Sequence, residues 1–474
     1  MSNDRTQAMP PGATGAFPGG ALGGAASDPN RTRLAGDAVS GTVPDPNRTQ
    51  MAVPPVTPAP VGTALSLSVR VGNRLADAGE RTRQFVLTQV EVSGNAATGG
   101  RRMPVNVALV IDRSGSMEGE PLQYVKQACS HVVDQLTPDD VLSIVTFEET
   151  VDVLMPARRV TDPALIKQHI ARIAPGNTTN LFDGLYAGGA QVASVPLAGY
   201  VNRVLLLTDG EPTAGLRDFA SIVGQAAELK ARGVTVTALG FGPEYNEELM
   251  AGIARRSGGN YYHIARPEQI PEVFRREMEQ VLGVTAKNAR LTLYLPRGCS
   301  VRQVYGAPVT FGPRTAEIAL GDLERGATVT KLWEVDWEPR RAGTYRVAKA
   351  VLTYEDGTSG RPVTASANAV AEFVTDPATL ASGVDVVVTK ELAVLQAGRD
   401  LEKTMMGMRT QQLSVADVTQ ALNKTQVLLH EQGHADAARE VADATQAFQG
   451  GDTGALNKTL IGAIWDIERG KRQG

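Results

Sequence analysis

Residues 105–111, Val-Asn-Val-Ala-Leu-Val-Ile, form a near-continuous apolar run. Such a run is expected of a strand that is buried on both faces, as in parallel sheets with helices on both sides. Between about 103 and 285, further strands of this kind are predicted at 142–147, 204–208 and 234–239. Helices are expected between or after them, near 122–136, 181–194, 215–231, 246–256 and 268–282. This alternation predicts an α/β fold with a doubly wound, mostly parallel sheet.

The segments on either side of this region have the period of two that marks half-buried strands. Strands are expected at 65–71 and 85–92, and again at 290–295, 330–335 and 345–352. The first two have no partners of their own, so we place residues 63–98 and 288–375 in one β-sandwich, with the α/β domain of 103–285 inserted between them. Residues 377–474 are predicted to be helical, with helices at 384–408, 414–431, 435–448 and 453–469. Gly433 and the pair at 450–451 mark turns between these helices.

Residues 1–62 are rich in Pro, Gly, Ala and Thr and have no hydrophobic period, so we expect a disordered tail. The sequence Asp-Pro-Asn-Arg-Thr occurs in it twice, at 28–32 and 45–49, and a shorter copy opens the chain. Arg directly precedes Thr6, Thr32 and Thr49. One interpretation is a low-complexity linker with a chance duplication. The other is a set of phosphorylation sites for a Ser/Thr kinase, and these motifs look like ligands of bacterial forkhead-associated domains, which read phosphothreonine.

Length and composition exclude several classes of function. A chain of 474 residues is expected to hold two or three domains. The net charge of −4 gives no support for nucleic-acid binding, which leaves a basic footprint. No apolar run approaches the ~18 residues of a membrane span, and residues 1–5 do not resemble a signal peptide, so we expect a cytoplasmic protein. Cys129 and Cys299 lie in apolar surroundings, and a buried thiol is expected for each.

Oxygen-bearing side chains follow the strands of the predicted parallel sheet. Asp112, Ser114 and Ser116 come directly after the first strand, and Asp209 ends the strand at 204–208. Ligands of open α/β sheets gather beyond the carboxyl ends of the strands, where the loop at 176–180 can contribute as well. An all-oxygen set suits a hard cation such as Mg²⁺. Each piece alone is equally typical of a helix cap or a turn, and only the ordered combination is specific.

The stretch 103–285 resembles a von Willebrand factor A domain of bacterial type, which has a Rossmann-like sheet. The metal-ion-dependent adhesion site of that family has the pattern D-x-S-x-S, then a threonine, then an aspartate in a T-D-G loop. The matching residues are Asp112, Ser114, Ser116, Thr179 and Asp209. Thr179 is preferred to Thr178 because the family threonine directly precedes an asparagine, here residue 180.

The resemblance implies a binding or scaffold protein rather than an enzyme. Ser114 and Ser116 would bind Mg²⁺ or Mn²⁺ directly, Asp112 would act mainly through its charge, and Thr179 and Asp209 would bind directly or through water. An Asp or Glu carboxylate of a protein partner would complete the coordination shell.

Two enzymatic alternatives remain open at the level of sequence. Residues 430–434 match H-E-x-x-H, the signature of zinc metallopeptidases, with His430 and His434 as ligands, Glu431 as base and Glu468 as a possible third ligand. Gly433 argues against this because glycine stops a helix, whereas the motif needs a continuous one. Asp112 also has the position of the nucleophile in a metal-dependent phosphohydrolase, but residue 114 is Ser and no activating group stands out.

Overall fold

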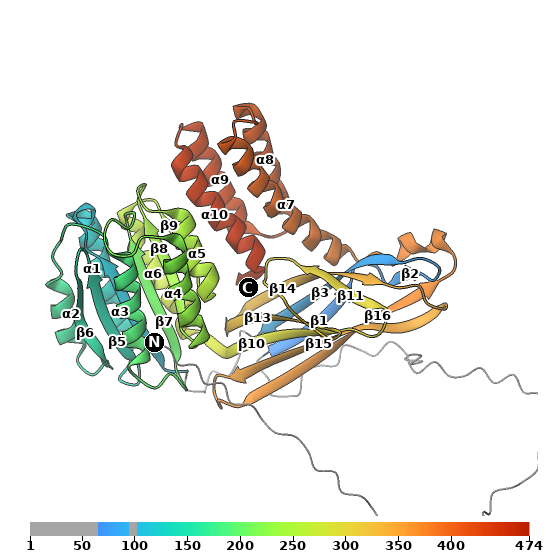
Figure 1. The fold of residues 1–474 in the computed structure, drawn as a ribbon, viewed down its shortest axis with the longest axis horizontal. Coiled ribbons are helices and arrows are strands. Elements are labelled where there is room, and N and C mark those ends of the chain that lie inside the picture. The colour runs from blue at the N-terminus through green and yellow to red at the C-terminus, as the bar shows by residue number, and fades with distance from the viewer. Residues whose placement is uncertain (1–64, 94–101, 474) are drawn as a thin grey trace, which may run out of the picture. The chain divides into compact units, whose positions relative to one another are not determined.

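The computed structural model describes residues 65–93 and 102–473. Thr6, Thr32 and Thr49 and the predicted tail of 1–62 lie outside the described residues. Three sheets form the framework of the described part. One is the sheet of the inserted α/β region, and the other two face each other as a sandwich (Figure 1). The predicted fold class is confirmed.

The α/β sheet has the strand order β6-β5-β4-β7-β8-β9. The strands are β4 (Val105–Asp112), β5 (Val141–Phe147), β6 (Val151–Arg159), β7 (Val201–Thr208), β8 (Thr235–Phe241) and β9 (Tyr261–Ile264). All neighbours are parallel except β6, which pairs antiparallel with β5. The sequence did not predict β6, because this edge strand contains Pro156 and lacks a clear alternation of apolar residues.

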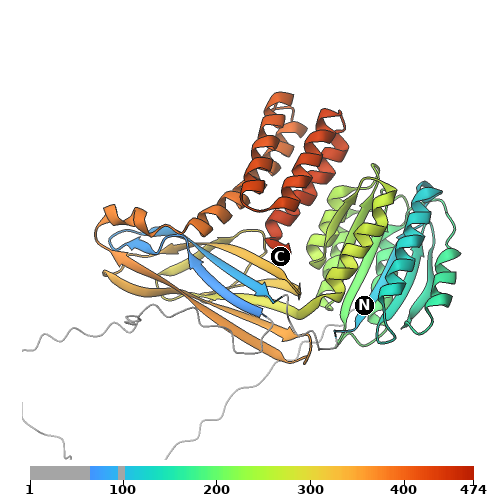
Figure 2. The same cartoon turned by 180° about the vertical axis from the view of Figure 1, so that it is seen from behind.

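Helices cover both faces of this sheet (Figures 1 and 2). They are α1 (Glu120–Gln135), α2 (Pro163–Ala171), α3 (Leu181–Ala193), α4 (Phe219–Ala231), α5 (Glu247–Ser257) and α6 (Ile270–Leu282), with short 3-10 helices η1 (Gly115–Met117) and η2 (Pro267–Gln269). Leu109 and Ile111 of β4 belong to the core that also contains residues of α1, α2 and α6, whereas Ala108 and Val110 belong to the core that contains residues of α3, α4 and α5. This two-sided burial explains why the run at 105–111 is apolar except for Asn106, whose buried amide donates hydrogen bonds to the Val192 carbonyl and to Asn202. Helix α4 begins later than predicted, because Asp218 caps it by accepting a hydrogen bond from the Ser221 N–H.

The sandwich consists of a five-stranded and a six-stranded sheet. The first has the order β1-β3-β14-β11, with β17 also paired to β14, and the second β12-β13-β10-β15-β16-β2. The strands are β1 (Leu65–Val71), β2 (Leu75–Asp77), β3 (Thr82–Val92), β10 (Val284–Tyr294), β11 (Cys299–Val304), β12 (Thr310–Gly312), β13 (Thr315–Glu324), β14 (Ala327–Trp337), β15 (Gly343–Asp356), β16 (Pro362–Val374) and β17 (Lys471–Gln473).

The strands before the α/β region pair with strands that follow it. β3 lies antiparallel to β14, and β2 lies parallel to β16. The predicted sharing of one sandwich by both segments is therefore confirmed. β10 begins at Val284 rather than at the predicted 290, because irregular pairing around Asn288, a residue with φ of 53°, hides its period of two.

Four helices follow the sandwich, close to where the sequence predicts them. They are α7 (Val386–Arg409), α8 (Val415–Glu431), α9 (Ala435–Gln449) and α10 (Thr453–Arg469), preceded by η3 (Pro377–Gly383). Their apolar faces share one core with Leu87, Tyr305 and Leu332 of the five-stranded sheet and its neighbouring loop. Lys458 of α10 donates hydrogen bonds to the Tyr245 carbonyl and to the Glu247 carboxylate of α5. The helices are thereby attached both to the sandwich and to the α/β region.

Cys129 and Cys299 are buried and free, as predicted. Within the residues that the structure describes, no helix combines the length and the apolar character that crossing a membrane requires.

Helix α6 closes the α/β region and is held by a buried carboxylate. Glu277 is fully buried and accepts hydrogen bonds from Thr237 Oγ1 at 2.6 Å, Asn260 Nδ2 at 2.5 Å and Tyr262 Oη at 3.1 Å. These donors belong to β8, the loop after α5, and β9. One side chain therefore fixes α6 against two strands.

We expect Glu277→Ala to lower the free energy of unfolding by about 2–4 kcal/mol, because two buried donors and one half-buried donor lose their acceptor. Urea unfolding followed by circular dichroism measures the change. Glu279→Ala is the matched control, since Glu279 lies on the same helix in an exposed ion pair with Arg275, and exposed pairs contribute only about 0–1 kcal/mol. Equal midpoints for the two variants would contradict the assigned role of Glu277.

Candidate metal centre

The candidate site lies at the carboxyl ends of β4 and β7. Asp112 is the last residue of β4, and Asp209 directly follows β7. The two strands are parallel neighbours, with Ile111 paired to Leu207. The two aspartates therefore leave the sheet at the same edge, as the sequence predicted.

Three oxygen atoms from these two loops converge. Ser116 Oγ lies 2.9 Å and Ser114 Oγ 3.3 Å from Asp209 Oδ1. The two serine hydroxyls are 3.2 Å apart. The turn η1 (Gly115–Met117) brings Ser116 back beside Ser114. Ser114 and Asp209 are buried while Ser116 is exposed, so the cluster is open to solvent on the side of Ser116.

Asp112 is fully buried beneath this cluster, and both of its oxygens are engaged. Oδ1 accepts a hydrogen bond from the Ser114 N–H at 2.8 Å, and Oδ2 accepts one from Thr208 Oγ1 at 2.5 Å. The carboxylate is thus fixed in orientation. Sequence reasoning did not single out Thr208 as a site residue, although its place as the first residue of the T-D-G motif is a signal for it.

The loop before α3 forms the third side of the site. A Cβ atom added to Gly210 would lie 3.5 Å from Thr179 Oγ1, which places this hydroxyl beside the Asp209 loop. The Thr179 N–H donates to Thr213 Oγ1 at 2.9 Å, and the Thr179 carbonyl accepts from the Thr213 N–H at 3.0 Å. The Gly115 N–H donates to the Asn177 carbonyl at 3.1 Å, which joins this loop to the serine loop.

Glu148, which was not predicted as a site residue, supports the same loop. Its side chain accepts a hydrogen bond from the Asn177 N–H at 3.0 Å and forms an ion pair with Arg113. Its backbone carbonyl accepts one from the Asn180 N–H at 2.8 Å. No short motif contains Glu148, since it follows β5 rather than β4 or β7.

The electrostatics of the site favour a bound cation. Burial, with a smaller contribution from the nearby charge of Asp209, raises the pKa of Asp112 to about 6 against the lowering effect of its hydrogen bonds. Burial likewise raises the pKa of Asp209, and Glu244 adds repulsion. Arg113 points to Glu148 and Asp152 instead. In the described part of the chain, no basic side chain forms an ion pair with either aspartate. An all-oxygen set with uncompensated negative charge fits a divalent hard cation.

The H-E-x-x-H segment does not form the continuous helix that a zinc peptidase needs. Helix α8 ends at Glu431, Gly433 has φ of 80°, and His434 occupies the position directly before α9. The predicted break at Gly433 is confirmed, and the two histidines belong to different helices. Glu468 forms an ion pair with Arg255 at 3.1 Å. Among the described residues, no group of three or more His, Cys, Asp or Glu side chains is arranged to hold a metal ion. The cluster at Asp112 has only two carboxylates and relies on hydroxyl groups.

Comparisons with known proteins identify the family of the α/β region. Residues 106–276 match the von Willebrand factor type A domain. A protein of Synechocystis is 30% identical over 310 residues, which cover 63% of this chain and 72% of the relative. The YfbK protein of Escherichia coli is 28% identical over 248 residues, and the match covers 50% of this chain and 42% of YfbK. A solved von Willebrand factor type A structure from Catenulispora acidiphila shares the fold with a TM-score of 0.68 at 17% identity, covering 87% of this chain and 99% of that one.

The fold and the edge-of-sheet cluster define a protein built around a von Willebrand factor A domain. The chain belongs to this family and has relatives in bacteria. The likeness to the Catenulispora structure extends the shared fold beyond the α/β region to most of the chain.

Thr208→Val tests whether the orientation of Asp112 matters for metal binding. The substitution keeps the shape of the side chain but leaves Asp112 Oδ2 without its hydrogen-bond donor. We expect the affinity for Mn²⁺, measured by calorimetry, to fall by roughly 10- to 100-fold, as for other residues that orient a metal ligand. Thr161→Val, at an exposed position, should leave the affinity unchanged. An unaltered affinity in Thr208→Val would show that the hydrogen bond to Asp112 is dispensable.

Proposed function

We propose that this protein binds or scaffolds other proteins through a Mg²⁺ or Mn²⁺ ion held at the Asp112 edge of the sheet. Ser114, Ser116, Thr179 and Asp209 are the proposed ligands, directly or through water, and Asp112 supplies charge and orients Ser114. The ion would capture an Asp or Glu carboxylate of the partner. The observation that supports this proposal most is the convergence of both serine hydroxyls on one oxygen of Asp209.

The composition of the site favours recognition over catalysis. Mg²⁺ demands near-octahedral coordination by oxygen, and the two aspartates and the hydroxyls supply few negative charges for it. A partner carboxylate would add both a ligand and a charge. Ser116 is exposed, so such a group has access. A von Willebrand factor A domain in itself indicates a role in protein interaction.

A phosphohydrolase mechanism through Asp112 is poorly supported by the same geometry. A nucleophilic carboxylate needs a free oxygen that can reach its substrate. Asp112 is fully buried, and both of its oxygens accept hydrogen bonds. We therefore propose a non-enzymatic role.

Asp112→Ala should abolish Mg²⁺ and Mn²⁺ binding and, with it, capture of the partner. The fold is expected to survive, because the site lies at the edge of the sheet rather than in its core. Calorimetry measures metal binding, and a pull-down with Mg²⁺ or with EDTA measures capture. Asp152→Ala is the control, since Asp152 pairs with Arg113 at the same edge but outside the cluster. Unchanged metal affinity in Asp112→Ala would remove the site assignment, and capture that resists EDTA would remove the metal-dependent mode.

The N-terminal repeats extend the proposal to regulation. A Ser/Thr kinase would phosphorylate Thr6, Thr32 and Thr49, and a forkhead-associated domain would bind the product, since a phosphate adds a charge of about −2 for an arginine-lined reader. Phosphorylated peptides of residues 1–12, 26–38 and 43–55 should bind such a domain from the same organism, and unphosphorylated peptides should not. Absence of phosphate on residues 1–62 of the native protein, measured by mass spectrometry, would count against this proposal.

The compartment proposed for the protein is the cytoplasm. The two buried free thiols agree with such a reducing compartment.

A further inference from the structure

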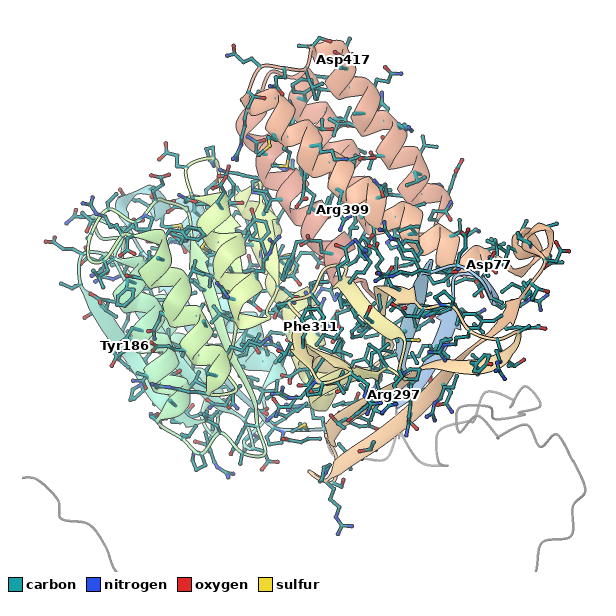
Figure 3. The ribbon with its side chains drawn as sticks, turned by 45° about the vertical axis from the view of Figure 1, so that its right-hand side comes forward. Asp77, Tyr186, Arg297, Phe311, Arg399 and Asp417 are labelled. Carbon is teal, nitrogen blue, oxygen red and sulfur yellow. The ribbon has the colours of Figure 1, made fainter. Side chains whose placement is uncertain are left out.

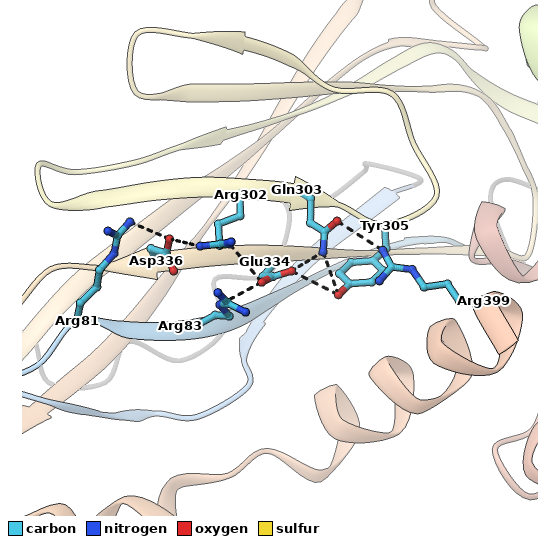
Figure 4. A network of polar contacts seen from close by, with 8 residues as sticks. All are labelled: Arg81, Arg83, Arg302, Gln303, Tyr305, Glu334, Asp336 and Arg399. Carbon is cyan, nitrogen blue, oxygen red and sulfur yellow. Dashed lines mark hydrogen bonds and ion pairs between the residues drawn. The ribbon is translucent and has the colours of Figure 1, made fainter. Parts of the chain in front are cut away.

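A second polar site lies on the outer face of the five-stranded sheet, where α7 approaches it. Its residues line a cavity of about 630 Å³ that we call the arginine pocket. Figure 4 shows all of them except Phe85, together with the neighbouring Arg81 and Asp336. Its walls come from three parts of the chain: Arg83 and Phe85 of β3, Arg302 and Gln303 of β11 with Tyr305 just beyond, and Arg399 of α7. Glu334 of β14 forms its floor. Figure 3 shows where Arg399 stands on α7.

The charges of the arginine pocket are layered. Glu334 and the neighbouring Asp336 are nearly buried, with side chains only 8% and 7% exposed, whereas Arg83 and Arg302 are 57% and 45% exposed. Arg83 and Arg302 each direct Nε to Glu334, at 3.3 Å and 3.4 Å. Negative charge therefore lies at the base, and guanidinium groups form the surface (Figure 4).

The pocket contains more positive charge than its ion pairs require. Three arginines and one glutamate line it, which leaves two positive charges in excess. Arg81 and Asp336 lie outside the pocket and form an ion pair, so their charges cancel and the excess positive charge stays at two. Arg399 stacks over the Tyr305 ring at 4.3 Å and touches Gln303, and no carboxylate in the described part of the chain pairs with it. Its guanidinium is held in place by an aromatic ring rather than by an anion.

We propose that the arginine pocket binds a phosphorylated serine or threonine of a partner protein. A phosphate monoester carries about −1.5 to −2 at neutral pH, which matches the excess charge, whereas one carboxylate does not. Each arginine has donors beyond those in its ion pairs, and guanidinium groups bind phosphate oxygens in pairs. The phosphate fills a small part of the cavity, and Phe85 and Tyr305 provide apolar walls for the residues beside it. This site is separate from the proposed metal centre and needs no metal.

A fluorescent phosphothreonine peptide with mixed flanking residues, titrated into the full chain and followed by anisotropy, tests the proposal. We expect binding that EDTA leaves unchanged and that the unphosphorylated peptide does not show. Inorganic phosphate should compete only at much higher concentration, because it gains nothing from Phe85 and Tyr305. Absence of binding overturns the proposal. Competition by inorganic phosphate as strong as that of the peptide overturns the assignment to a protein-borne group.

Arg399 is the residue to change, because Arg83 and Arg302 also neutralise the nearly buried Glu334 and their loss puts folding at risk. Arg399→Gln should weaken peptide binding by about tenfold or more, the loss expected for one charged hydrogen-bonding group. Arg399→Lys keeps the positive charge but loses the paired donors of the guanidinium group, so it should give a smaller loss of affinity. Lys403→Gln removes one charge from the exposed side of the same helix and should change nothing. Equal affinities of Arg399→Gln and the wild type would refute the site.

Discussion

The burial of β4 on both faces is the constraint on which the rest of the structure depends. Leu109 and Ile111 belong to one core and Ala108 and Val110 to the other, so neither side of the strand can face water. The two polar side chains of β4 lie near its ends and are hydrogen-bonded: Asn106 donates to the Val192 carbonyl and to Asn202, and Asp112 accepts from Thr208 of the next strand. The same close packing requires small residues in α3, where a Cβ on Gly188 would lie 2.2 Å from Val110 Cγ2. The candidate metal centre thus lies at the polar end of a largely apolar strand.

A fully buried carboxylate is costly unless its charge is neutralised. Around Asp112 the protein supplies hydrogen bonds but no cation, and the raised pKa records the remaining penalty. Glu277, buried to the same degree, has three donors and fastens a helix. The two carboxylates differ in what surrounds them: Glu277 is enclosed by α6, β8 and β9, whereas Asp112 lies beneath hydroxyl groups that open to solvent. Only the second arrangement has a side open to solvent, at Ser116, from which an ion and a ligand of another molecule have access.

The features that could be predicted from the sequence are those that depend on residues close to one another in the chain. They include the apolar run at 105–111, the ordered motif of Asp112, Ser114 and Ser116, and the glycine between α8 and α9.

Features that depend on contacts between residues far apart in the sequence were not predicted. Edge strand β6 contains a proline, and β17 becomes a strand only because β14 offers it a free edge. Glu148 supports the Thr179 loop through contacts that no motif marks. The arginine pocket joins residues from β3, β11, β14 and α7, so no stretch of sequence reveals it. The metal-ligand roles themselves remain a prediction.

The contacts around α6 connect the α/β region, which contains the candidate metal centre, to the rest of the chain. α6 ends at Leu282 and β10 begins at Val284, so a single residue separates the α/β region from the sandwich. Glu277 of α6 accepts a hydrogen bond from Asn260, whose side-chain oxygen accepts one from Arg469 at the end of α10. The chain then continues directly into β17, which pairs with β14 of the five-stranded sheet. A displacement of α6 would therefore strain contacts in both the sandwich and the C-terminal helices. Two sites communicate when both shift the equilibrium between two states of the same structural element. Here α6 is the element that connects the α/β region with the sandwich and with the C-terminal helices.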